Sequence, residues 1–185
     1  MRRTVALASL VLLAGCGQPW EVIVQSGPPA ALRGAGPLTL SWDTSELELD
    51  EDPLDEAFSE MSPAARREVE RSLSDMRSTF AGELGGQLPV RVAMASGTPD
   101  PSETRIHARL LELERGARGP VGGRTRLVMR IDWIVGGEVV DAIRVERSEP
   151  PSVQRPTVPQ RLHLLSAEAA QITARFFEAE QERDE

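Results

Sequence analysis

Few residues of this 185-residue chain have types and spacing suited to catalysis. His163 and Ser166 stand three positions apart in a helical pattern, a spacing that could bring a base and a nucleophile together. No Gly-x-Ser-x-Gly turn surrounds Ser166 and no acid is placed to orient His163, so we interpret both as ordinary helix-surface side chains. His107 alternates with Arg105 and Arg109 on the polar side of a predicted strand, where it should be exposed. The sequence therefore predicts a protein that is not an enzyme.

An acidic segment is the candidate for cation binding. Residues 43–60 contain nine acids and no base. They do not fit a calcium-binding EF-hand loop, because the required glycine after Asp50 is missing and Leu54 occupies a ligand position. We expect a solvated acidic loop, with cation binding left open. One cysteine and two histidines exclude the usual zinc sites, and Gly119–Gly123 lacks the Lys-Ser/Thr of a phosphate-binding loop, so no metal or cofactor is expected.

Arginines on the predicted strands are the one organised polar feature. Most of them fall on the side away from the alternating apolar residues, so they could form a basic sheet face on an acidic protein. Such a face would suit an acidic protein surface, lipid headgroups or a glycan. The alternative is that arginine merely replaces lysine, which the chain lacks, on solvated strands. The candidate partner face comprises Arg105, Arg109, Arg124, Arg126, Arg130 and Arg144, with Arg147 on the same strands.

The only cysteine of the chain, Cys16, lies in a sequence motif that is more specific than the features above. Arg2 and Arg3 precede an apolar run that ends at Leu13 and is far shorter than the ~20 residues that span a bilayer, which predicts a signal peptide over residues 1–15. The run leads into Leu13-Ala14-Gly15-Cys16, which resembles the lipobox of bacterial lipoproteins position by position. The resemblance implies signal-peptidase recognition of Leu13, Ala14 and Gly15, cleavage before Cys16, and lipidation of the Cys16 sulfur and the new amino group.

Acyl chains on Cys16 would hold the mature protein on a membrane. The next residue is Gly17, whereas an Asp there marks inner-membrane retention in enteric bacteria, so we expect the outer membrane, facing the periplasm. A content of 40% hydrophobic and 27% charged residues is typical of a globular domain. The formal net charge of -8 argues against nucleic acid as a partner.

The rest of the chain predicts one α+β domain over residues 38–182. Prolines and glycines mark residues 16–37 as lipid anchor and flexible tether. Trp20–Val24 interrupts the tether, and an edge strand is favoured there over a sticky segment near the membrane. The end of the last helix is acidic from Glu178 to Glu185, which opposes the helix dipole, so the tail of residues 183–185 should fray. Strands are predicted at 38–42, 88–95, 104–114, 124–135 and 138–147, and the apolar phase of the third suggests a β-bulge or two partly buried faces.

Two helices carry apolar stripes. The first should begin at Ser62-Pro63 and end at Gly85-Gly86, and Thr157-x-x-Gln160 has the form of a capping box that opens the second. At Gly136-Gly137, a three-residue loop would pair Met129 with Val145 and so match the apolar faces, which favours it over a two-residue loop. The predicted fold is an antiparallel sheet of four to five strands with both helices packed on one face.

This order of elements resembles the outer-membrane lipoproteins of the curli-secretion CsgG and penicillin-binding-protein activator LpoB families. The matching stretches are Leu38–Trp42, Pro63–Leu84, Thr104–Arg147 with its glycine turn, and Gln160–Glu180. The resemblance implies a non-catalytic accessory component of a cell-envelope assembly that binds another envelope protein. The alternative is a lipoprotein that binds a small anionic ligand or a glycan, which three Trp, four Phe and no Tyr make less favourable.

Overall fold

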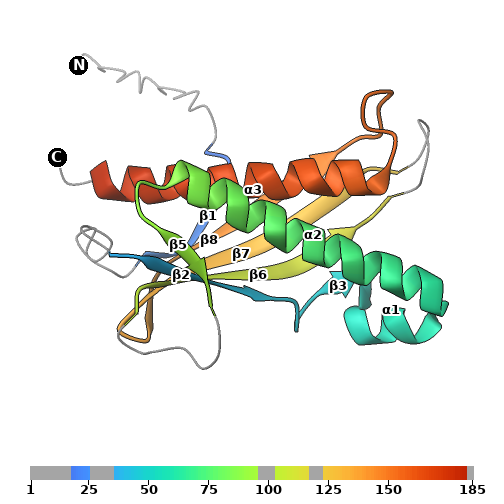
Figure 1. The fold of residues 1–185 in the computed structure, drawn as a ribbon, viewed down its shortest axis with the longest axis horizontal. Coiled ribbons are helices and arrows are strands. Elements are labelled where there is room, and N and C mark those ends of the chain that lie inside the picture. Colours follow the sequence, from blue (N-terminus) through green and yellow to red (C-terminus); the bar gives the residue numbers. More distant parts are fainter. Residues whose placement is uncertain (1–17, 26–35, 96–102, 117–122, 183–185) are drawn as a thin grey trace, which may run out of the picture.

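A computed structural model of the chain describes residues 18–25, 36–95, 103–116 and 123–182. They form an α+β fold in which three helices accompany one open, mostly antiparallel sheet of eight strands (Figure 1). The elements in chain order are β1 (Glu21–Gln25), β2 (Leu38–Asp43), β3 (Glu48–Leu49), β4 (Asp52–Pro53), α1 (Leu54–Glu60), α2 (Pro63–Gln87), β5 (Val92–Met94), β6 (Arg105–Glu114), β7 (Thr125–Val135), β8 (Glu138–Glu149) and α3 (Val158–Glu182).

The strand order is β1-β8-β7-β6-β2-β5, and the two-residue strand β3 pairs with both β6 and β4. Strands β6, β7 and β8 are antiparallel neighbours, as predicted. Strand β2, however, is parallel to both β5 and β6, so the expectation of a purely antiparallel sheet is corrected. The reason is that α2 separates β2 from β5, and a crossover of this length returns the chain in the same direction. The expected numbers of strands and helices were also too low.

Helices α2 and α3 cover the same face of the sheet (Figure 1), as predicted. The Ser62 hydroxyl accepts the N–H of Ala65 at 3.3 Å and caps α2. Thr157 and Gln160 form the predicted capping box at α3, each side chain accepting the other residue's backbone N–H. Helix α2 continues through the two glycines to Gln87, because the N–H of Leu88 still bonds the Leu84 carbonyl at 3.1 Å.

One hydrophobic core lies between these two helices and the sheet. Trp133 of β7 is fully buried, with its ring centroid 4.7 Å from that of Phe176 on α3. Phe80 of α2 is also fully buried and lies 5.6 Å from Trp42 of β2. The predicted stripe of α2 is buried at Val69, Met76, Phe80 and Leu84, and half-buried at Ala65 and Leu73. The core residues of β6 and β7 alternate with side chains that point away from the helices.

Two bulges set the registers of the long strands. The pairing of β6 with β7 shifts between Leu110 and Glu112, which confirms the bulge suggested by the apolar phase. At the β7–β8 connection, two glycines with φ of 62° and 85° form a two-residue turn. The register then shifts between Trp133 and Ile134, so Met129 pairs with Val145 as predicted. The predicted three-residue loop is wrong, because the bulge and not the loop supplies the extra residue.

The acidic segment 43–60 is folded, so the expectation of a solvated loop is corrected. Strands β3 and β4 meet in a tight turn at Asp50 and Glu51, whose φ values of 54° and 80° are both positive. The Asp50 carboxylate accepts the backbone N–H of Arg115 at 2.8 Å and its Nε at 2.7 Å. Leu47 and Leu49 are buried in the core, and α1 completes the segment. Leu47 and Leu49 alternate with acidic residues, so the leucines face the core while the acids face the solvent, and this burial explains why the segment folds.

Strand β1 forms one edge of the sheet and pairs antiparallel with β8, which confirms the strand favoured after Trp20. The range expected to be tether therefore contains a strand of the sheet. Leu13, Ala14, Gly15 and Cys16 lie outside the described residues. Within the described residues, none of the helices combines the length and the apolar character needed to cross a membrane.

Candidate functional site

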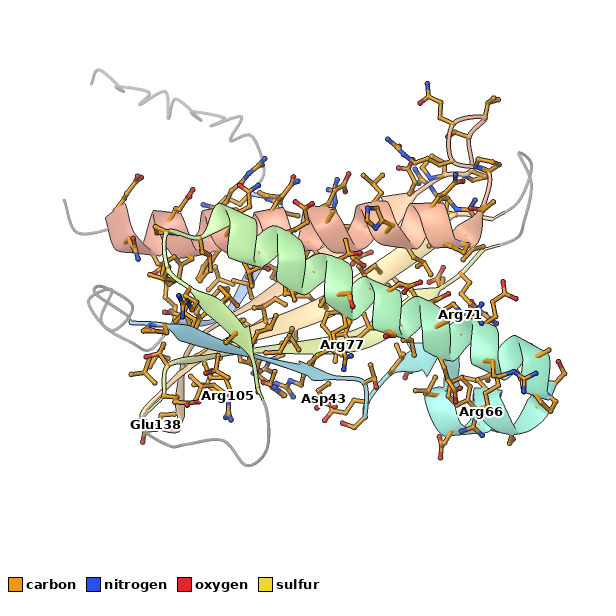
Figure 2. All side chains as sticks on the ribbon, in the orientation of Figure 1. Asp43, Arg66, Arg71, Arg77, Arg105 and Glu138 are labelled. Carbon is orange, nitrogen blue, oxygen red and sulfur yellow. The ribbon has the colours of Figure 1, made fainter. Side chains whose placement is uncertain are left out.

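The face of the sheet opposite α2 and α3 carries a dense set of charged side chains, and we call it the open face. Its residues occupy the positions of β2, β6, β7 and β8 that alternate with core residues. Figure 2 places Arg105 and Asp43 on this side of the sheet, away from α3. The charged members are Arg105, Arg109, Arg126, Arg130 and Arg144 together with Asp43, Glu112, Glu114, Asp132 and Glu146.

Three of the arginines lie side by side in one row across the strands. Arg109 of β6 is the register partner of Arg130 of β7, which in turn is the partner of Arg144 of β8. Like charges directly opposite one another destabilise a sheet, so this row requires compensating acids. Glu21 of β1 is the register partner of Arg144 and ends the row at the sheet edge.

The buried carboxylate of Asp132 compensates two members of the row. Its Oδ2 accepts Arg109 Nη2 at 2.6 Å, and its Oδ1 accepts Arg130 Nε at 2.7 Å. Asp132 is only 2% exposed, so the two guanidinium groups replace the water that it loses on folding. Removing either partner would leave a buried charge with half of its compensation.

Arg126 of β7 is the centre of a second cluster, whose acids come from the two neighbouring strands, β6 and β8. Its Nη1 donates to Glu112 and Glu114 of β6 at 2.5 and 2.9 Å, and its Nε donates to Glu146 of β8 at 2.8 Å. Arg144 bridges Glu112 and Glu146 at 3.5 and 3.3 Å. The hydrogen bond to Glu146 is the main reason that the pKa of Arg126 is raised, and the same bond lowers the pKa of Glu146.

His107 lies at the β2 side of the open face, between a hydroxyl and a carboxylate. Its Nδ1 is 2.7 Å from Ser41 Oγ, and its Nε2 is 3.6 Å from Asp43 Oδ2. Burial is the largest influence on His107 and lowers its pKa, so the ring is neutral at pH 7. The predicted exposure of His107 is corrected, because the ring is half-buried. In this row of three groups, the imidazole can polarise the Ser41 hydroxyl, or the hydroxyl and the Asp43 carboxylate can fix the orientation of the ring. Both contacts also link β2 to β6.

The open face is therefore a mixed-charge surface, and the predicted basic face is corrected in that respect. It carries five arginines and five carboxylates, most of which are joined in ion pairs. Arg124 is exposed just before β7. Arg147 lies on the other face of the sheet, where its Nε donates to Glu168 of α3 at 2.8 Å. Five of the six arginines proposed from the sequence lie on this face, whereas the acids between them were not predicted.

A second candidate site is a cleft between α2 and the start of α3. It has a volume of about 310 Å³, and its apolar floor includes Met76 and Leu162. His163 borders the cleft, with Nδ1 3.0 Å from the hydroxyl of Thr79. Ser166 is fully buried and donates to the Leu162 carbonyl at 2.8 Å, so it does not meet His163. The remaining polar lining consists of Ser72, Asp75 and Ser78.

Neither candidate site contains a metal-binding cluster. Among the side chains that the structure describes, no group of three or more His, Cys, Asp or Glu is arranged to hold a metal ion. The glycine-rich stretch 119–123 falls almost wholly outside the described residues. On the open face, Ser41 and His107 form a close hydroxyl–imidazole contact.

No protein-family model matches the chain, and no curated protein matches it. Among solved structures, the PelC dodecamer from Paraburkholderia phytofirmans is similar, with 16% identity over 82% of this chain and 97% of that chain and a TM-score of 0.46. A minor lipoprotein from Acinetobacter baumannii is 15% identical over 76% of this chain and 92% of that chain, with a TM-score of 0.36. These TM-scores are too low to carry an argument about this chain.

Proposed function

We propose that the chain is a lipid-anchored, periplasm-facing lipoprotein of the outer membrane and a non-catalytic binding component of a cell-envelope assembly. In this proposal Cys16 carries the lipid, and the open face binds another envelope protein. The observation that carries the second part is the network of arginines and carboxylates that cross-links β6, β7 and β8 on a face that none of the described helices covers.

An ordered charge network is well suited to specific binding. Immobilising a long side chain at an interface costs about 0.5–1.5 kcal/mol, and the arginines of the open face are already held by hydrogen bonds before a partner arrives. A fixed pattern of opposite charges also rejects partners whose charges fall in the wrong places. The expected partner therefore presents a polar surface whose charges complement the open face, with acids facing the row Arg109–Arg130–Arg144.

The test is recovery of the partner from membranes with paired charge-reversal variants. The full chain is purified in mild detergent, and proteins that accompany it in stoichiometric amounts are identified by mass spectrometry. Arg144→Glu on the open face is compared with Arg66→Glu, which breaks an exposed pair with Glu70 on α2. We expect Arg144→Glu to lose the partner and Arg66→Glu to retain it, with both variants folded by circular dichroism. Equal recovery by both would remove the open face as the binding surface.

The anchor is tested separately with Cys16→Ala. The parent chain should fractionate with membranes and carry the mass of acyl groups, whereas the variant should lose both properties. A parent chain without acyl mass would refute the lipoprotein part of the proposal and leave the binding face to be judged on its own.

A second candidate function, binding of a small ligand, is favoured by the interhelical cleft. Its hydroxyls and the Asp75 carboxylate above an apolar floor suit a neutral polyol or a sugar better than an anion. A panel of monosaccharides and short glycans tested by thermal shift on the parent chain and on Thr79→Val would decide this. A shift seen with the parent and lost in the variant would support it, and no shift with any member would reject it.

A further inference from the structure

We propose that the β1 edge of the sheet is the part of the domain that contacts the lipid surface, so that the sheet stands on this edge at the membrane. The β1 edge comprises Trp20, Val22, Ile23 and, on the adjoining strand β8, Val139. This inference rests on the proposed lipidation of Cys16.

The chain belongs to the folded domain from Trp20 onward. The Trp20 ring meets Phe176 of α3 edge-on, with centroids 5.8 Å apart and planes at 85°. Strand β1 then pairs with β8 through Gln25, whose side-chain amide donates to Glu180 of α3 at 3.2 Å. Contacts with both the sheet and α3 therefore fix the start of the domain.

The length of chain between the anchor and this point is very short. Trp20 follows Cys16 by four residues, which span at most about 14 Å when fully extended. Residues 26–35 come after β1, so they add nothing to this reach. At the opposite edge of the sheet lies β5, five strand spacings from β1, or about 24 Å. Acyl chains in the bilayer therefore hold the β1 edge within reach of the headgroups, while β5 stands well away from them.

The exposed apolar side chains are distributed in agreement with this orientation. Val22, Ile23 and Val139 are 41%, 42% and 37% exposed, and they are three of the five large hydrophobic residues that are exposed in the described part of the chain. The register of β1 shifts at Ile23, so this residue is an extra one in the edge strand. Trp20 adds an aromatic ring, the type of side chain enriched at membrane–water interfaces.

Contact of this kind is apolar and not electrostatic. The chain has a net charge of -8 and Glu21 lies in the β1 edge, so anionic lipids offer no attraction. The orientation also has a consequence for the proposed binding face. When the sheet stands on β1, its open face points sideways along the membrane, toward a partner held in the same membrane.

The test uses one spin label at each end of the sheet. Because lipid modifies the only native cysteine, an added cysteine would be the single free thiol. Ile23→Cys at the β1 edge is matched by Met94→Cys on β5, which is 43% exposed. Each full-length, acylated variant is spin-labelled and reconstituted into phosphatidylcholine–phosphatidylethanolamine vesicles. Collisions of the label with oxygen, which concentrates in lipid, and with a water-soluble nickel chelate are measured by electron paramagnetic resonance.

We expect the label at position 23 to lose its accessibility to the nickel chelate and to gain accessibility to oxygen, and the label at position 94 to remain open to the chelate. Val139→Cys provides a second label on the same edge if the first variant does not fold. Equal access of the chelate to positions 23, 139 and 94 on an acylated chain would overturn the inference and leave the proposed function standing. Absence of acyl mass on the parent chain would refute both.

Discussion

Replacing Arg126 with methionine should destabilise the domain more than its partial exposure suggests. The guanidinium bonds three carboxylates, from Glu112, Glu114 and Glu146, and methionine keeps the length of the side chain but none of these bonds. Each half-exposed pair contributes between about 0.2 and 1 kcal/mol after solvent screening. The three acids would also repel one another once the shared cation is gone. We expect a loss of about 2 kcal/mol at pH 7.

Thermal unfolding followed by circular dichroism measures this loss. For a domain of this size 1 kcal/mol corresponds to about 2–4 °C, so Tm should fall by about 4–8 °C. Arg67→Met is the matched control, because Arg67 is exposed on α2 and its side chain makes no ion pair or hydrogen bond within the described part of the chain. Substitutions at such exposed positions change the stability by about 0.5 kcal/mol or less, so the control should change Tm by no more than about 2 °C.

The pH dependence gives an independent check on the cause. The bond to Arg126 lowers the pKa of Glu146 in the folded state below its ordinary value of 4.5. The stabilisation is then complete above pH 4.5 and is lost as the pH falls through the lowered pKa, while Arg126 stays charged throughout. The difference in Tm between the parent and Arg126→Met should therefore shrink between pH 5 and the most acidic pH at which both fold. A difference that is small at pH 7, or that stays constant in acid, would refute the reasoning.

Three further predictions concern residues elsewhere in the fold. Phe80→Ala should cost about 3–5 kcal/mol by urea unfolding, because the ring is fully buried against Trp42; a loss below 1 kcal/mol would contradict the described core. Arg161→Met should cost about 1–3 kcal/mol and speed hydrogen exchange in residues 150–157, because the buried Arg161 donates to Thr125 and to two carbonyls of that segment; unchanged exchange would show that it does not hold the segment. Ser41 should not react with a fluorophosphonate, and one probe mass added at Ser41 would contradict the non-catalytic proposal.

Local patterns in the sequence predicted the antiparallel hairpins and the helix starts. The alternation of apolar residues in β7 and β8, together with the short glycine turn, predicted the partner of Met129, because a slip by one residue would turn one apolar set toward the open face. The caps at Ser62 and Thr157 depend on residues only three positions apart, which is why they were predictable. The bulge in β8 was not, since nothing in the pattern says whether the extra residue lies in the turn or in the strand.

Neither the direction of β2 nor the structure of the acidic segment was predicted correctly from the sequence, and the reasons differ. A short alternating strand such as β2 has the same pattern whether its neighbours are parallel or antiparallel. In residues 43–60 the high content of acids led to the prediction of a solvated loop. The alternation of Leu47 and Leu49 with polar residues, which places both leucines in the core, was therefore not interpreted as a strand. The turn with positive φ at both Asp50 and Glu51 also gave no signal, because such turns favour glycine at the second position, which Glu51 occupies.

The candidate site was predictable only in part, because the pairing register of the strands decides which acids lie beside the arginines. Arg126 lies beside carboxylates that are 12, 14 and 20 residues away in the sequence, and they become neighbours only through the pairing of three strands. Counting arginines on predicted strands therefore placed five of them on one face but missed the acids that share it. The contact between Ser41 and His107 depends in the same way on the parallel pairing of β2 with β6.

The pairing of β1 with β8 also imposes an order on folding. The partner residues of β1 lie about 120 residues further along the chain, which is the longest separation among the strand pairings of the described residues. If the chain is exported from its N-terminus, β1 crosses the membrane before the other strands. It can join the sheet only after residues 141–144, which are its partners, have also crossed. Until then its apolar side chains are unprotected, and a nearby lipid surface could shelter them from aggregation. The proposed lipid on Cys16 would thus assist folding during biogenesis, before the finished domain meets a partner.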